Sequence, residues 1–355
     1  MQEITSRKLK ILFFSFVGEN YSRSSITLHG ESLIYEKKFI QLPVGLLTSS
    51  RMILARIWEI KSADNLVVMS PCHIIAPILK LFTRKQVVLD AGWPLTDGQL
   101  SRGLSIRGGF KLFQTYLIDF IAFHSVDRLI VESEAQRIRT SRIFFIPKKK
   151  IEVNFTGLDE SAFVGDTCTS GKIQELDKKL VKSGFHTTIL FRGKINNESG
   201  IQNIVSAAVK LEKKATFILV SNKNNLLVKL PSNVIWLSEL TNDELKSVYE
   251  RSDIVLGQIS NHPRLSYTIP HKAFEAGFFS KTYLTADTRG IRELYGPDAI
   301  CVIDDISGSG LATEIEKLFD SSIRTEFARR IHLEYNEKAS QKILSAKFER
   351  ILQGL

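Results

Sequence analysis

Buried strands and helices alternate along this chain, and that alternation constrains the fold more than any other feature. In the first half, the short apolar run at 10–16 ends before Gly18, which is the pattern of a strand buried on both faces. Similar runs follow at 65–70, 86–90, 127–132 and 151–155, and helical stretches such as 110–123 separate most of them. Strands that alternate with helices favour a parallel sheet covered by helices on both faces.

A second alternating series begins after residue 186. Its expected strands are 187–191, 215–220, 233–237, 253–256, 282–285 and 300–303. Thr241 and Glu244 have the spacing of a capping box, in which the two side chains bond free backbone N–H groups at the start of a helix. We therefore expect an α/β chain made of two doubly wound domains.

Length and local composition place the boundary between these domains. A chain of 355 residues is long for one hydrophobic core, so two domains are favoured. The stretch from about 157 to 185 is polar, contains several glycines and shows no buried strand. The expected division is a first domain at 1–165, a linker at 166–186, a second domain at 187–325 and C-terminal helices at 326–355.

The net charge of +10 is unevenly distributed. The stretch 101–150 holds ten basic and four acidic residues, a local balance of +6, with Phe110, Leu112 and Phe113 interleaved. Such a stretch suits an anionic membrane surface, nucleic acid or a phosphorylated substrate, and it is equally compatible with an ordinary solvated face. No helix-turn-helix, zinc-finger or RNA-binding signature accompanies the charge, so nucleic acid is not an expected partner.

The chain carries no sequence signal for secretion or for spanning a membrane. No apolar run reaches the roughly 18 residues that a membrane helix needs, and no signal-peptide cleavage site precedes the first strand. Cys72, Cys168 and Cys301 are widely separated, which does not suit a disulfide framework or a thiolate metal site. We expect a cytoplasmic protein, with possible peripheral contact at the cytoplasmic face of an anionic membrane.

Three strand-to-helix loops of the second half are candidate binding loops, because parallel sheets bind ligands beyond the carboxyl ends of their strands. In the first loop, Arg192, Gly193 and Lys194 follow a strand, and Gly200 precedes a helix. The glycines permit close approach and the cations favour a diphosphate, although an ordinary strand–turn–helix has the same pattern. The second loop begins at Leu237 and offers backbone groups to a nucleobase, as many such loops would.

The third loop leads into the helix that begins near Pro270. Glu275 falls among apolar neighbours in that helix, where a carboxylate is costly unless it is paired or hydrogen-bonded. Two ribose hydroxyls would satisfy it, and Lys272 could reach a phosphate or pair with Glu275. The alternative is an amphipathic helix with Glu275 on its solvated edge. The position beyond a strand end favours the binding interpretation.

Taken in order, these motifs resemble the donor-binding domain of retaining glycosyltransferases of family 4, in particular exopolysaccharide- and lipopolysaccharide-type members. The resemblance is most specific at 270–277 and 285–294, and it includes 189–201 and 240–256. Looser similarity covers 125–134 and 154–159 in the first half. The resemblance implies the GT-B fold, in which two Rossmann-like domains face each other across a cleft and C-terminal helices return toward the first domain.

The same resemblance implies a function. The implied reaction is the transfer of a sugar, of hexosyl type, from a nucleotide-sugar donor to a sugar or lipid-linked acceptor. The transfer is metal-independent and retains the anomeric configuration. It would serve surface polysaccharide or glycolipid synthesis. No cofactor beyond the nucleotide-sugar co-substrate and no metal site is implied. The expected donor-binding residues are Arg192, Gly193, Lys194, Ser199, Leu237, Thr268, Lys272 and Glu275.

Catalytic candidates come from both halves. Family members often carry a glutamate eight positions before the ribose-binding glutamate, and this chain has Tyr267 there. In the first half, Asp90 lies in a segment similar to the family's Trp-Pro strand end, and His73 follows another strand end. Tyr267, Asp90 and His73 are therefore the catalytic candidates. Two alternatives stay open. One is a sugar-nucleotide epimerase, which has the same fold, and the other is a catalytically degenerate nucleotide-binding subunit, which the departure at Tyr267 makes reasonable.

Overall fold

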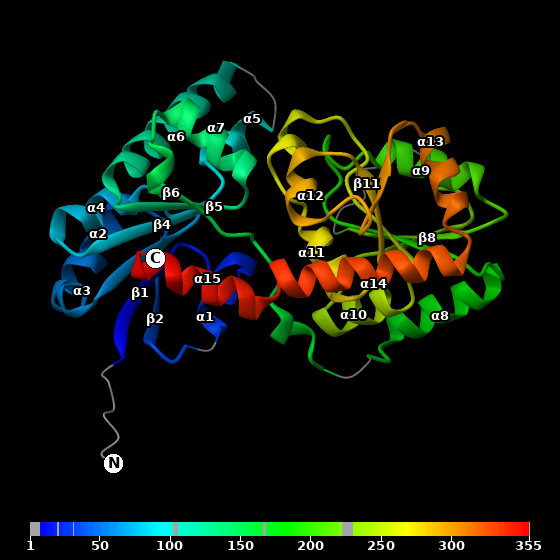
Figure 1. Ribbon diagram of the computed structural model, residues 1–355, viewed down its shortest axis with the longest axis horizontal. Helices are drawn as coiled ribbons and strands as arrows, with labels where there is room; N and C mark the ends of the chain where they lie inside the picture. Colours follow the sequence, from blue (N-terminus) through cyan, green and yellow to red (C-terminus); the bar gives the residue numbers. More distant parts are fainter. Residues whose placement is uncertain are drawn as a thin grey trace, which may run out of the picture. The chain divides into compact units, whose positions relative to one another are not determined.

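The computed structural model describes residues 8–19, 21–30, 32–101, 106–165, 168–221 and 230–354, without the side chains of Ser22, Ile106 and Arg107. The chain divides into two compact units, one formed by residues 1–157 with 341–355 and the other by 158–340. Each unit is built around one parallel six-stranded sheet (Figure 1). The prediction of two doubly wound α/β units is confirmed. Among the described residues, no helix combines the length and the apolar character needed to cross a membrane.

The first unit has strand order β2-β1-β3-β4-β5-β6, with every neighbouring pair parallel. Its elements are β1 (Leu9–Ser15), α1 (Ser22–His29), β2 (Tyr35–Gln41), α2 (Leu46–Ala55), α3 (Ile57–Ser62), β3 (Asn65–Met69), α4 (Ile75–Phe82), β4 (Gln86–Gly92), α5 (Leu95–Leu100), α6 (Ile106–Ser125), β5 (Arg128–Val131), α7 (Glu134–Phe144), the 3₁₀ helix η1 (Lys148–Lys150), β6 (Ile151–Val153) and α15 (Gln341–Gln353).

Strand β2 was not predicted, because its sequence lacks the signal used for the others. It lies at the edge of the sheet and pairs with β1 alone. Only Tyr35 and Ile40 of its side chains are buried, and three charged residues and the half-buried Phe39 separate them. An edge strand tolerates such charge, and charge there discourages pairing with other chains. The alternation of a half-exposed strand is easily lost in so short and polar a segment.

Helices cover both faces of the first sheet. One core cluster joins β1, β3, β4 and β5 to α2, α4 and α6 on one face. On the other face, Phe348, Ile351 and Leu352 of α15 pack on Ile11 and Phe13 of β1. The rings of Phe13 and Phe348 stack with centroids 6.0 Å apart. The last helix of the chain therefore completes the core of the first unit, as the predicted return of the C-terminal helices requires.

The second unit has strand order β12-β11-β10-β7-β8-β9, again all parallel. Its elements are the 3₁₀ helix η2 (Glu160–Phe163), α8 (Gly171–Ser183), β7 (Thr188–Arg192), α9 (Ile201–Lys210), β8 (Thr216–Val220), β9 (Val234–Leu237), α10 (Asn242–Glu250), β10 (Ile254–Leu256), the 3₁₀ helix η3 (Pro263–Ser266), α11 (His271–Phe278), β11 (Thr282–Ala286), α12 (Arg289–Leu294), β12 (Cys301–Ile303), α13 (Gly308–Lys317) and α14 (Ser321–Lys338).

Packing in the second unit follows the same layered plan. Helices α9 and α13 supply apolar side chains to one core cluster of the sheet, and α14 packs against α11 and β11. The capping box predicted for α10 is present, with Thr241 accepting from the Glu244 N–H and Glu244 accepting from the Thr241 N–H. The segment expected as a linker contains α8, which packs against α10, and Asp166 and Thr167 of that segment lie outside the described residues.

Candidate functional site

The order of the second sheet singles out one position for ligand binding. Strand β7 lies beside β10, and the chain builds outward from this pair in opposite directions, to β8 and β9 on one side and to β11 and β12 on the other. Such a position is called a topological switch point. The helices that follow the two neighbouring strands go to opposite faces of the sheet, and this leaves a crevice at the strand ends. Arg192 ends β7, and the loop after β10 begins at Gly257. The predicted phosphate loop therefore borders the switch point.

Two glycines determine the course of the loop between β7 and α9. Gly193 has φ 145°, which strongly favours glycine. Gly200 has φ 65°, and a Cβ placed there would lie 1.8 Å from the carbonyl oxygen of Ile259 in the loop after β10. Only glycine allows this approach. The sequence expectation that these glycines permit tight turns is confirmed, and Gly200 additionally brings the two loops at the switch point into direct contact.

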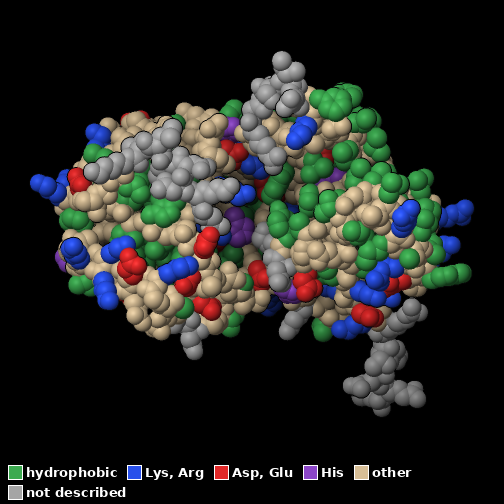
Figure 2. Space-filling view, turned by 180° about the vertical axis from the view of Figure 1, so that it is seen from behind, with side chains coloured by type: hydrophobic (Ala, Val, Ile, Leu, Met, Phe, Trp, Pro, Cys, Tyr) green, Lys and Arg blue, Asp and Glu red, His purple; other side chains and the backbone are tan. Residues whose placement is uncertain are grey.

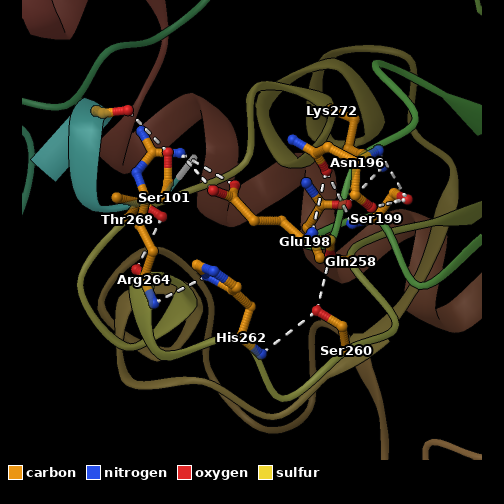
Figure 3. A network of polar contacts seen from close by, with 11 residues as sticks. Ser101, Asn196, Glu198, Ser199, Gln258, Ser260, His262, Arg264, Thr268 and Lys272 are labelled. Atoms are coloured by element: carbon orange, nitrogen blue, oxygen red, sulfur yellow. Dashed lines mark hydrogen bonds and ion pairs between the residues drawn. The ribbon is translucent and has the colours of Figure 1, made fainter. Parts of the chain in front are cut away.

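An ion pair and several hydrogen bonds hold these loops together (Figure 3). Nη1 of Arg264, in η3, lies 3.1 and 3.0 Å from the two carboxylate oxygens of Glu198. The Ser260 hydroxyl donates to the Glu198 carbonyl at 2.9 Å, and the Thr268 hydroxyl donates to the Arg264 carbonyl at 3.1 Å. Because Glu198 is buried, its charge needs this partner. The loops are thus held in a defined arrangement.

Glu275 lies at the centre of a buried polar cluster. Its side chain is 1% exposed, and its Oε1 lies 2.8 Å from Nη1 of Arg192 and 3.2 Å from Nδ1 of His271. The Tyr249 hydroxyl donates to Oε2 at 2.5 Å. Burial alone would raise the pKa of Glu275, but the Arg192 charge and the contacts of His271 and Tyr249 outweigh it and lower the pKa to about 2. The carboxylate is therefore ionised and fixed in orientation.

Lys272 is buried one turn earlier on α11. Its Nζ donates to the Gly257 carbonyl at 3.2 Å and to Oε1 of Gln258 at 3.3 Å, and it lies 3.7 Å from the centroid of the Phe191 ring. These partners are neutral. Burial consequently lowers the pKa of Lys272 well below its ordinary value, an effect that Glu275 opposes only in part. A buried ammonium with neutral partners is a group that an anion would stabilise.

The remaining predicted donor residues occupy different surroundings. Lys194 is exposed, whereas the buried Ser199 hydroxyl donates to the Asn196 carbonyl at 2.6 Å. Thr268 is buried beneath α12, and Tyr267 is half-buried at the end of η3. Leu237 ends β9, two strands away from β7, and lines a hollow of about 190 Å³ with residues of α8. Arg192, Gly193, Lys272 and Glu275 are thus brought together, and Leu237 lies apart from them.

Several members of the cluster were not predicted from the sequence. His271 precedes Glu275 by one helical turn, so the i, i+4 spacing is a signal that finds it. Tyr249 has no comparable signal, because it belongs to α10 and meets Glu275 of α11 only through tertiary packing. Glu198 and Arg264 have no local signal either, since they lie 66 residues apart and meet only through the ion pair between their segments.

Two buried polar networks lie at strand ends in the first unit. Asp90, at the end of β4, accepts from Nε of Arg23 at 2.6 Å. Arg23 also donates to the Thr156 hydroxyl and the Asn154 carbonyl, both at 3.2 Å. Burial raises the pKa of Asp90, and the Arg23 charge opposes that rise. Asp90, predicted as a catalytic candidate, is thus the partner of an arginine.

His73 is fully buried beside Asp119 of α6. Its Nδ1 lies 2.7 Å from Oδ1 of Asp119, whose Oδ2 accepts from the Thr96 N–H at 2.8 Å and the Thr96 hydroxyl at 2.6 Å. Since Asp119 accepts at both oxygens, the His73 ring donates through Nδ1, and Nε2 is left as an acceptor. Within the described part of the chain, Nε2 has no hydrogen-bond partner. Of the two first-unit candidates, His73 is the one with an unsatisfied polar atom.

Solved structures show which fold this is. Anabaena Alr3699/HepE, in complex with UDP and glucose, aligns over 98% of this chain and 100% of its own, with a TM-score of 0.70 at 13% identity. A glycosyltransferase from Rickettsia africae ESF-5 aligns over 98% and 99%, with a TM-score of 0.70 at 12% identity. The chain has a GT-B-like fold.

The GT-B-like fold is shared by more than one class of protein. A protein assigned as a UDP-N-acetylglucosamine 2-epimerase from Listeria monocytogenes aligns over 98% of this chain and 96% of its own, with a TM-score of 0.61 at 11% identity. No protein-family profile matches the sequence, and no curated protein matches it either. At such identities the likeness concerns the fold, and the function has to be argued from the site.

Proposed function

We propose that this protein binds a nucleotide-sugar donor at the switch point of its second unit and transfers the sugar to an acceptor. The observation that carries the proposal is Lys272, a buried ammonium held by neutral oxygens next to Gly193. A donor diphosphate at Gly193 would supply the missing negative charge, and glycine at that position lets it approach the backbone closely. The same cation would stabilise the nucleoside diphosphate as it leaves.

Glu275 and Arg192 have complementary parts in this proposal. A carboxylate accepts about four hydrogen bonds, and protein groups already use three at Glu275. One acceptor position therefore remains for a ribose hydroxyl, rather than the two that the sequence suggested. Arg192 is 35% exposed and uses Nη1 on Glu275, so its other N–H groups can reach a phosphate. Ser199 and Thr268 would contribute through the positions of their loops, whereas Leu237, which lies apart, is left out of the proposed site.

In the first unit, His73 stays the proposed catalytic residue, and Asp119 holds its ring at 2.7 Å. Its free Nε2 is an acceptor that a hydroxyl group would satisfy. Retention of configuration, hexosyl transfer and charge neutralisation by protein cations in place of a metal follow from the family resemblance. So do a sugar or lipid-linked acceptor and a role in surface polysaccharide or glycolipid synthesis. A cytoplasmic site of action is proposed because the widely separated cysteines suit a reducing compartment. The HepE complexes with UDP-glucose and with UDP support a nucleotide-sugar donor.

Calorimetric titration with a panel of nucleoside diphosphates tests donor binding, because it needs neither the sugar nor the acceptor. We expect one nucleotide to bind, and Lys272→Met to weaken it at least about tenfold. Lys213→Met, an exposed lysine in the turn before β8, is the matched control and should bind like the wild type. Equal affinity in all three proteins would contradict the assignment of the site.

Turnover separates the proposed activity from its rivals. Radiolabelled nucleotide sugars are incubated with and without extracts that contain acceptors. Incorporation of label that depends on the acceptor supports transfer. Conversion of donor without acceptor would favour the epimerase, an alternative that the similarity in fold to the Listeria protein supports. Tight nucleotide binding with no turnover would favour a degenerate subunit, which Tyr267 in place of a glutamate makes reasonable.

A further inference from the structure

The outward face of α6 is unusual for a helix exposed to water. Its exposed large side chains are Phe110, Phe113, Leu117 and Ile121, which are 66%, 63%, 45% and 46% exposed. Spacings of three and four residues place them in one stripe along the helix. Figure 2 shows hydrophobic side chains gathered along the upper right edge of the molecule, where α6 runs. A surface helix normally presents charged and polar groups at these positions.

No carboxylate interrupts this stripe in the described part of α6. The acidic residue of the helix, Asp119, is fully buried against His73 and Thr96. The other exposed side chains between 110 and 124 are Lys111, Gln114 and His124. The stripe is therefore apolar and, apart from one lysine, uncharged. Arg102 and the side chain of Arg107, which belong to the basic stretch of the sequence, lie outside what the structure describes.

A third exposed aromatic side chain, Phe145, adjoins the C-terminal end of α6. Nε2 of His124 lies 3.0 Å from the Phe144 carbonyl oxygen, and the next residue, Phe145, is 75% exposed. Phe145 adopts the left-handed conformation, with φ 56°, at the C-terminal cap of α7. Glycine is the usual residue there, since a side chain costs on the order of 1 kcal/mol in that conformation. The backbone conformation of Phe145 is therefore unfavourable. Its exposed ring is also unfavourable unless another surface covers it.

Exposed cations lie close to Phe145 along the chain. Arg142, Lys148 and Lys149 are exposed on either side of Phe145, and Lys150 bonds the carbonyl of His124 at 3.0 Å. The nearby carboxylates are already paired. Asp127 bonds Lys80 at 2.6 Å, Glu134 bonds Arg137 at 2.8 Å, and Glu152 bonds Arg128 at 2.6 Å. The surface therefore combines apolar side chains with a positive field.

We propose that this surface docks onto an anionic lipid bilayer. The α6 surface is defined as Phe110, Phe113, Leu117, Ile121 and Phe145 together with Lys111, Arg142, Lys148 and Lys149. Apolar side chains enter the boundary between headgroups and acyl chains, and lysine and arginine beside them pair with anionic headgroups. This assignment is independent of nucleotide binding, because none of these residues belongs to the donor site.

A second copy of the chain fits the surface less well. A two-fold interface brings the same patch of each copy together. Parallel pairing of α6 would place Lys148 and Lys149 against themselves, and antiparallel pairing would place them against Lys111. Both arrangements oppose like charges in a desolvated contact, which costs binding energy. An anionic bilayer instead pairs every one of these cations.

Co-sedimentation with vesicles tests the proposal. One set of vesicles is phosphatidylcholine, and the other contains about 30% phosphatidylglycerol, a composition that gives a negative surface potential. We expect binding to the anionic vesicles and at least about tenfold weaker binding to the neutral ones. The double variant Phe113→Ser/Leu117→Ser should lose at least about tenfold in affinity for the anionic vesicles, and Lys148→Glu/Lys149→Glu a comparable amount.

Matched controls use exposed residues of the second unit. Val181→Ser/Val209→Ser removes two exposed apolar side chains, and Lys178→Glu/Lys182→Glu makes the same change in net charge. Both should bind vesicles like the wild type. Wild-type protein that stays in the supernatant, or α6 variants that bind like wild type, would overturn the proposal. So would sedimentation-velocity data in which the wild type dimerises and the α6 variants do not, since a second copy would then cover the surface.

Discussion

Arg192 and Glu275 form a buried ion pair, with Nη1 2.8 Å from Oε1, although 83 residues separate them in the sequence. Arg192 ends β7, and Glu275 lies in α11, which follows β10. Because β7 and β10 are neighbours at the switch point of the sheet, the two side chains meet beyond the strand ends. Tyr249 and His271 complete the shell around the carboxylate. This pair therefore links the architecture of the second sheet to the proposed donor site.

Glu275→Gln should destabilise the protein by about 2–4 kcal/mol, because it leaves Arg192 without its carboxylate and disturbs the hydrogen bonds of Tyr249 and His271. Urea unfolding followed by circular dichroism measures the change. Glu337→Gln on the exposed side of α14 is the control, and its effect should stay within about 0.5 kcal/mol. A variant as stable as the control would show that the pair adds nothing to stability.

The contribution of Glu275 should depend on pH in a defined direction. Its pKa in the folded protein is about 2, compared with an ordinary value of 4.5. A lowered pKa means that the folded state favours the ionised form, so the stabilisation is complete above about pH 5 and is lost as the pH falls toward 2. The stability difference between wild type and Glu275→Gln, measured by urea unfolding from pH 7 to 2.5, should accordingly narrow below pH 4.5. A stability difference that stays constant over this pH range would contradict the lowered pKa of Glu275.

Lys272→Met should separate stability from binding. Burial of the ammonium among neutral groups opposes folding, so the isosteric apolar side chain should leave stability unchanged or raise it by about 1 kcal/mol. Nucleotide affinity should nevertheless fall. Thermal unfolding with and without the best-binding nucleoside diphosphate measures both, since a bound ligand raises Tm. A marked loss of stability without nucleotide would show that Lys272 is a structural group.

Two glycines with the same backbone conformation offer a matched comparison. Gly200 and Gly184 have φ 65° and 69°, but a Cβ at Gly200 meets the Ile259 carbonyl, whereas a Cβ at Gly184 has no atom within 4 Å. Gly184→Ala should cost about 1 kcal/mol, the penalty of the left-handed conformation. Gly200→Ala should cost at least about 2 kcal/mol and weaken nucleotide binding, because the two loops must separate. If urea unfolding gave similar losses of stability for Gly184→Ala and Gly200→Ala, the close contact of the two loops would be disproved.

Asp119 should determine the tautomer of His73. Because Asp119 accepts from Nδ1, we expect the tautomer with the proton on Nδ1, and nitrogen chemical shifts of labelled histidine report this directly. In Asp119→Asn the side-chain amide can donate to the ring, which should shift the proton toward Nε2. Transfer should then slow at least about tenfold, with donor affinity unchanged. An unaltered tautomer would exclude this positioning role.

Much of the fold was predictable because it rests on local pattern. Eleven strands were recognised from short apolar runs, and the run at 127–132, for example, corresponds to β5 (Arg128–Val131). Strand β2 escaped because an edge strand buries few side chains. The loop at 192–200 was noticed for a similar reason, since Gly193 and Gly200 mark backbone conformations that other residues avoid. Glu275 was noticed because a carboxylate among apolar neighbours requires a partner.

The sequence by itself determined where all strands but β2 lie, that they build two parallel sheets, and that Arg192, Lys272 and Glu275 follow strand ends. These features depend on periodicity, capping and turn chemistry within a few residues of each other. Only the tertiary structure decided that Arg192 pairs with Glu275, that Lys272 is left among neutral oxygens, and that α15 completes the first core. Such contacts depend on strand order and on side-chain packing between distant segments, and no local pattern encodes either.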